Sequence, residues 1–178
     1  MKNLGRISIT AVALWALHGA GNAQAQQVKP QCTDDSRQCM IAAATSYLEG
    51  IVHHDGSKVL FAPDAVRTEQ GHDTGKGEAT LRAALLKMPP MLGYRNTRFV
   101  IDRESHQLVY YTLLRLEIDG SRAAGNPPPP ASTQAGPVTV HLAERFKIEH
   151  GLIEEIEAIF TNQAGTADGV SGWPDPSG

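Results

Sequence analysis

The chain has 178 residues, of which 41% are hydrophobic and 20% are charged, with a formal net charge of -3. This near balance of 16 basic and 19 acidic residues argues against nucleic acid as the main partner. Aromatic residues make up only 6% of the chain, which disfavours surfaces on which bases stack. The one strongly apolar stretch, at the N-terminus, is too short to span a membrane, which excludes a multi-pass membrane protein. We therefore expect one globular domain.

The first 25 residues have the pattern of an export signal. Lys2 and Arg6 precede an apolar stretch, residues 7–17, and Ala23-Gln24-Ala25 supplies the small residues that a signal peptidase requires. Cleavage after Ala25 would leave 178 - 25 = 153 residues, enough for one core. We expect an exported protein, periplasmic or secreted, whose mature form does not contact a membrane.

The two cysteines, Cys32 and Cys39, are seven positions apart. Within one helix this spacing would separate them by roughly 10 Å, beyond the reach of a disulfide. A bridge is possible if Cys32 precedes the helix, and Asp34, Asp35 and Ser36 can cap a helix start between the two. Export to an oxidising compartment favours the disulfide over two free thiols.

The hydrophobic pattern has helices first and strands after. Apolar residues recur every three or four positions in residues 39–53 and 78–88, which predicts two amphipathic helices. Between them we expect a short helix, a turn, a brief extended run and a Gly-rich loop, at residues 57–60, 61–64, 65–69 and 71–77.

Alternation of period two then predicts four strands, at residues 94–103, 106–119, 138–149 and 152–160. The expected organisation is an α+β domain at residues 39–160, preceded by an arm at 26–38 and followed by a tail at 161–178. A polyproline insertion, residues 120–137, separates the second and third strands. The helices are expected to cover the concave face of a curved antiparallel sheet.

Two segments resemble the nuclear transport factor 2 superfamily. One is residues 47–71, a helix that ends in His-Asp-Gly followed by Phe-Ala-Pro-Asp-Ala-Val and an acidic residue. The other is residues 144–156, a hairpin typical of SnoaL-like and ketosteroid-isomerase-like members. Cys32, residues 68–71 and residues 171–174 are most similar to a secreted subgroup without an assigned function. The resemblance implies a cone-shaped α+β barrel with an apolar pocket, no cofactor and a homodimer.

Residue by residue, the likeness to ketosteroid isomerase is incomplete. It places the oxyanion-hole tyrosine at Tyr47 and the general base at Glu69. The second oxyanion donor falls on Leu142, which puts the same reaction in doubt. A carboxylate at the mouth of an apolar pocket is suited to act as a base, and a buried phenol can hold a developing oxyanion. The alternatives are a solvated strand end for Glu69 and a core tyrosine for Tyr47.

Several further residues are candidates for binding. Alternation places Leu142, Glu144 and Phe146 on one face of their strand, so Glu144 is either a second acid or base or a partner of Arg98 or Arg115. The remaining candidates are His72 and Asp73 at the pocket rim, His141 if a bulge turns it inward, and Trp173 if the tail docks. No spacing typical of a metal site accompanies the seven histidines.

Two functions follow as hypotheses. The first is an exported enzyme of isomerase, lyase or hydratase/hydrolase type that performs acid/base chemistry on a small hydrophobic or aromatic molecule. The second is a non-catalytic module that binds such a molecule. Because the fold itself hosts both classes, only the chemistry of the pocket can distinguish them.

Overall fold

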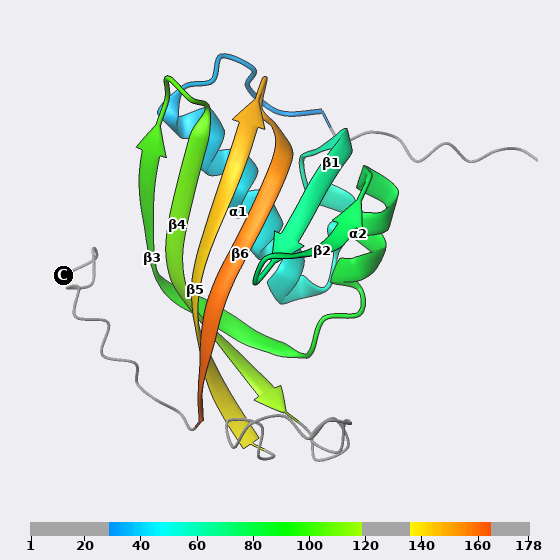
Figure 1. The fold of residues 1–178 in the computed structure, drawn as a ribbon, viewed down its shortest axis with the longest axis vertical. Helices are drawn as coiled ribbons and strands as arrows, with labels where there is room; N and C mark the ends of the chain where they lie inside the picture. Colours follow the sequence, from blue (N-terminus) through cyan, green and yellow to red (C-terminus); the bar gives the residue numbers. More distant parts are fainter. Residues whose placement is uncertain (1–28, 119–135, 165–178) are drawn as a thin grey trace, which may run out of the picture.

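The computed structural model describes residues 29–118 and 136–164. Two α-helices and one turn of 3-10 helix accompany six strands (Figure 1). Their bounds are α1 Arg37–His53, η1 Gly56–Lys58, β1 Phe61–Glu69, β2 His72–Lys76, α2 Glu78–Leu85, β3 Met91–Asp102, β4 Gln107–Ile118, β5 Gly136–Glu149 and β6 Leu152–Ala164. The predicted export signal, most of the polyproline insertion and Trp173 lie outside these residues.

The strands form one curved sheet in the order β2-β1-β6-β5-β4-β3. Strand β1 runs parallel to β6 and all other neighbours are antiparallel, so the sheet is mixed rather than purely antiparallel as predicted. Helix α1 crosses one face of the sheet, and α2 lies beside β1 and β2 (Figure 1). This confirms an α+β fold in which helices cover one face of a curved sheet.

Helix α1 begins and ends where local chemistry predicts. The Ser36 hydroxyl accepts a hydrogen bond from the Cys39 amide at 3.2 Å, which caps the first turn. His54 adopts a left-handed conformation at the other end and closes the helix. Between the caps, the buried stripe packs on the sheet; its members are Met40, Ala43, Ala44, Tyr47, Leu48 and Ile51.

Two predicted elements were wrong in kind, and a third is shorter than expected. The Gly-rich loop at 71–77 contains strand β2, which a tight turn at Gln70-Gly71 folds back onto β1. The expected turn at 61–64 is the first half of β1, because pairing with β6 extends that strand. The short helix expected at 57–60 is a single 3-10 turn.

Other predicted elements differ only in their ends. Helix α2 ends at Leu85 rather than Met88, since the Pro89-Pro90 pair disfavours helix at the residue before it. Strand β3 starts three residues earlier than predicted, at Met91, and β6 runs on to Ala164. Strand β5 begins at Gly136, inside the expected insertion.

An aromatic cluster lies at the centre of the core, between α1 and the sheet. The Tyr47 ring meets Phe61 and Phe146 edge-on, with centroids 5.9 and 5.7 Å apart. Tyr110 packs against Phe146 at 5.2 Å. All four side chains are buried, and the cluster packs directly beside the polar groups described below.

Candidate functional site

A cavity of ≈ 330 Å³ opens beside the aromatic cluster, between α1, the segment after α2 and the sheet. Most of its wall is apolar, and Arg67, Glu69, Glu144 and Asn162 are the polar members of its lining. Its volume is in the range of small-molecule sites. The apolar lining consists of Ile51, Met88, Pro89, Met91, Leu114, Leu116, Val140, Leu142 and Phe160.

The two carboxyl groups of the cavity reach it through the register of the sheet. Glu69 of β1 and Glu144 of β5 both pair with Ala158 of β6, one from each side. Residues paired directly across strands share a face, and neighbouring strands lie about 4.8 Å apart. Both carboxyl-bearing side chains therefore lie on the same face of the sheet, on either side of Ala158.

Glu144 is fully buried, as the alternation in its strand predicts. The Tyr110 hydroxyl donates a hydrogen bond to Glu144 Oε2, and Tyr110 is the direct partner of Glu144 across β4 and β5. The guanidinium of Arg67 lies close by, with its Nε 3.9 Å from Oε1. The predicted pairing with Arg98 or Arg115 is therefore replaced by Arg67, because β1 lies next to β6 and brings Arg67 to the same face.

Burial raises the pKa of Glu144 from 4.5 to about 7, although Arg67 and the Tyr110 hydrogen bond favour the ionised form. Nearby Glu69 adds to the rise by repulsion. Burial and the charge of Glu144 also raise the pKa of Tyr110 well above its usual value, so the phenol keeps its proton and stays a donor. Glu144 can therefore exchange a proton near neutral pH.

Arg67 connects the two carboxyl groups. Its Nη2 lies 2.7 Å from Glu69 Oε2, and its Nη1 donates to Thr74 Oγ1 at 2.8 Å. Burial acts against the charge of Arg67, but Tyr47, Glu144 and Glu69 outweigh burial and raise its pKa. The guanidinium is therefore a permanent positive charge that orients Glu69 at the edge of the cavity.

Tyr47, the predicted oxyanion donor, belongs to the core and is not among the residues that line the cavity. Burial and the charge of Glu144 raise the pKa of its phenol, while Arg67 opposes the rise by its charge and a hydrogen bond. Tyr47 thus adjoins the polar network from the side of α1 and does not contact the cavity directly.

The other predicted binding residues that the structure describes lie away from the cavity lining. His72 and Asp73 are exposed in β2, and Arg98 is a residue of β3. His141 is on the opposite face of β5 from Glu144, where its Nε2 lies 2.9 Å from Gln163 Oε1. The only irregularity in the described pairing of β5 with β6 lies between Lys147 and Ile148, too far along the strand to turn His141 inward.

Sequence reasoning missed three polar residues of this site, Arg67, Tyr110 and Asn162. Alternation carried the signal for the first two. Arg67 is two residues before Glu69 in an extended run, so the two side chains share a face. Tyr110 likewise shares a face with the buried Leu108 and Thr112. Asn162 lies in the part of β6 beyond the predicted strand end.

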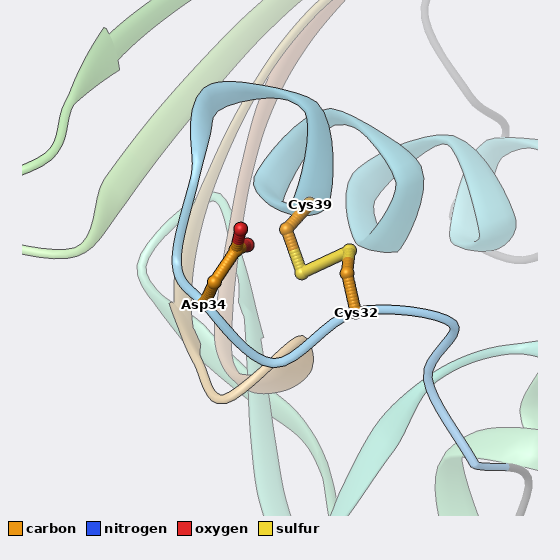
Figure 2. A group of neighbouring side chains, drawn as sticks. All are labelled: Cys32, Asp34 and Cys39. Atoms are coloured by element: carbon orange, nitrogen blue, oxygen red, sulfur yellow. A yellow bond between two sulfur atoms is a disulfide. The ribbon is translucent and has the colours of Figure 1, made fainter.

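The predicted disulfide is present. Cys32 and Cys39 are bonded with their Cα atoms 5.6 Å apart, and Figure 2 shows the arm turning back to bring Cys32 beside the start of α1. Asp34 lies close to both sulfur atoms, but bonded sulfurs are not the thiolates that bind metals. The arm also covers the hairpin between β5 and β6, where a Cβ on Gly151 would collide with the Cys32 carbonyl oxygen.

Residues 33–160 match the family of the domain of unknown function DUF8021. The chain belongs to this family. The match spans the sheet up to Phe160 and both helices, so the network around Glu144 and every lining residue of the cavity except Asn162 lie inside the DUF8021 domain. No curated protein matches the chain.

Solved structures show that the DUF8021 fold is NTF2-like, as the sequence resemblance implies. The NTF2-like protein of unknown function from Burkholderia xenovorans LB400 is 11% identical, with TM-score 0.51 over 78% of this chain and 94% of that one. The epoxide hydrolase/cyclase-like enzyme SalBIII, described with pyran ring formation in the polyether salinomycin, is 12% identical, with TM-score 0.55 over 75% and 96%. An LEH-like epoxide hydrolase of M. tuberculosis is 16% identical, with TM-score 0.50 over 70% and 84%.

Neither helix that the structure describes is long and apolar enough to cross a membrane.

Proposed function

We propose that this DUF8021 protein is an enzyme that performs acid/base chemistry, using only groups of its own chain, on a small hydrophobic molecule bound in the cavity. The observation that carries the proposal is the pair of carboxyl groups, Glu69 and Glu144, joined by Arg67 in a cavity whose wall is mostly apolar. One of them is buried and exchanges its proton near neutral pH, while the other is held by a guanidinium. Such asymmetry assigns different roles to the two groups.

In this proposal Glu69 is the base and Glu144 is the acid. The Glu69 carboxylate accepts a proton from a substrate carbon atom or from a water molecule, and the Glu144 carboxyl gives its proton to a substrate oxygen atom. One proton enters the protein as another leaves, so the exchange balances without a cofactor. Isomerisation, lyase cleavage, and hydration or hydrolysis all use such a pair. The donor role predicted for Tyr47 passes to Glu144, because Tyr47 lies outside the lining.

Two of the similar structures are described as epoxide hydrolase-like enzymes, which supports an enzyme of this general type. The disulfide between Cys32 and Cys39 supports the further proposal that the protein works outside the cytoplasm. Cell fractionation followed by N-terminal sequencing tests export. The expected mature chain begins at Gln26, and a cytoplasmic protein that retains Met1 would exclude it.

The acid/base proposal is tested by screening apolar and aromatic compounds for thermal stabilisation, with product analysis of every compound that binds. Glu69→Gln is expected to keep binding and lose turnover by roughly 100-fold or more, the usual contribution of a general base. Glu157→Gln is the matched control, because Glu157 pairs with Arg145 away from the cavity lining. Compounds that bind without conversion by any variant would favour the non-catalytic binding module instead.

A further inference from the structure

The mouth of the cavity is an apolar surface that the described residues leave partly uncovered. We define the mouth by the lining residues that are not fully buried. They are Met88, Pro89, Met91, Phe160 and Asn162, of which Asn162 is exposed and the others are partly buried. An apolar patch with a polar group at its margin is typical of a surface that another group covers.

Strand β6 ends at this mouth. One row of directly paired residues crosses four strands here, and its members are Ala164, Val138, Leu116 and Met91. Leu116 and Met91 line the cavity, so the last residue of β6 lies in the same row of the sheet as the mouth. Figure 1 shows β6 ending at the same end of the sheet as β4. Three strand spacings of about 4.8 Å separate Ala164 from Met91 by roughly 14 Å.

The sequence that follows Ala164 carries one large aromatic side chain within reach of the mouth. Residues 165–178 are mostly small or polar, and Trp173 is the one aromatic residue among them. Trp173 is 173 - 164 = 9 positions beyond Ala164, and nine extended residues span up to about 30 Å. Trp173 can therefore reach the mouth of its own chain, and its burial would stabilise more than that of any other side chain in the tail.

The chemistry of the mouth suits an indole ring. The thioethers of Met88 and Met91 can adapt to a neighbouring shape, and sulfur makes favourable contacts with aromatic rings. Phe160 offers a ring for an edge-to-face contact. A buried indole N–H requires an acceptor, and the side-chain amide oxygen of Asn162 supplies one at the margin of the apolar surface.

We infer that Trp173 packs against Met88, Met91 and Phe160 and covers the mouth of the cavity in its own chain. The indole then forms part of the wall that a bound molecule meets. The inference does not rest on the proposed function, because it requires no proton transfer and no substrate.

The fluorescence of Trp173 tests the inference in the full chain. The sequence has two tryptophans, so in the Trp15→Phe protein all tryptophan emission comes from Trp173. We expect this emission at a shorter wavelength in the native protein than in the same protein unfolded in urea. Burial of a large apolar side chain favours the packed form by about tenfold or more, so acrylamide should quench the native emission about tenfold less.

Matched substitutions locate the indole. Met88→Asp and Met91→Asp should each return the emission of Trp173 to the wavelength of the unfolded protein, because packing the indole would strip water from the new carboxylate. Leu86→Asp and Leu92→Asp are the controls, since these neighbours are exposed and do not line the cavity. They should leave the emission unchanged. Met88 precedes β3 and Met91 begins it, so one variant remains informative if the other does not fold.

The inference is overturned if Trp173 in the native protein emits and is quenched as it is in urea. It is also overturned if the two leucine variants release Trp173 as readily as the two methionine variants. Emission that changes when the protein is diluted would place Trp173 on a second copy of the chain and would overturn it as well. None of these results bears on turnover, and the proposed function fails separately if Glu69→Gln leaves the conversion of any substrate unchanged.

Discussion

The buried carboxyl of Glu144 makes the stability of the protein depend on pH in a way that Glu144→Gln removes. Its pKa is raised by burial to about 7, above the value of 4.5 for an ordinary glutamate. The folded state therefore holds this proton more tightly than the unfolded state does. The resulting stabilisation is fully present below pH 4.5 and is lost as the pH rises through 7.

A rise from 4.5 to about 7 corresponds to about 3 kcal/mol, at about 1.4 kcal/mol for each pH unit. Between pH 4 and pH 8 the unmodified protein loses this amount, and Glu144→Gln does not. The free energy of unfolding of the variant, relative to the unmodified protein, should therefore increase by about 3 kcal/mol over this range. For a protein of this size the corresponding change in melting temperature is roughly 6 to 12 °C.

Urea unfolding followed by circular dichroism, at several pH values between 4 and 8, measures both proteins. Every other titrating group is shared, so the difference between the two curves isolates Glu144. Leu142→Ala is the matched control, because it removes a neighbouring side chain of the same strand and cavity that does not titrate. Its loss of stability should be smaller than the about 2 to 5 kcal/mol of a fully packed leucine, because one side of Leu142 faces the cavity, and it should be the same at every pH.

A difference between Glu144→Gln and the unmodified protein that changes by less than about 1 kcal/mol over this range would refute the reasoning. It would mean that Glu144 is hydrated in solution. The acid role proposed for Glu144 would then be refuted, because it depends on a pKa raised by burial.

The other predictions concern the surroundings of the cavity. Replacing Cys32 and Cys39 by serine should cost about 2 to 3 kcal/mol of stability in urea unfolding, the value for so short a loop, and an unchanged midpoint would contradict a structural role for the bond. Gly151→Ala should destabilise the protein by more than about 1 kcal/mol, because Gly151 has φ 75° and its Cβ would meet the Cys32 carbonyl; a neutral effect would show that the arm does not cover the hairpin. Ala158→Leu should destabilise the protein by about 1 to 3 kcal/mol, because Ala158 is fully buried between the strands that carry Glu69 and Glu144, and an unchanged midpoint in urea would contradict this close packing. Tyr110→Phe removes a hydrogen bond that lowers the pKa of Glu144, so the fall in stability should shift to higher pH, and an unmoved profile would count against that bond.

Much of the fold could be predicted from local patterns. Period-two alternation placed Glu144 on the same face as Leu142 and Phe146, and the structure confirms that all three are buried. The predicted export signal, with the candidate caps Asp34, Asp35 and Ser36 between the two cysteines, led to the disulfide, and the structure has Ser36 as the cap. These features depend on residues close together in the chain, whose geometry the helix and strand periods determine.

The identity of the groups around Glu144 depended on the order of the strands. Arg67 reaches Glu144 because β1 lies parallel to β6, a pairing of segments almost 90 residues apart that no local pattern specifies. The same pairing places Ala158 between Glu69 and Glu144, and the burial that follows raises the pKa of Glu144. The sequence by itself determined which side chains face inward. Which of them meet, and how much water they lose, was decided only when the helices and the curved sheet packed together, because desolvation is a property of the packed interior and not of any one segment.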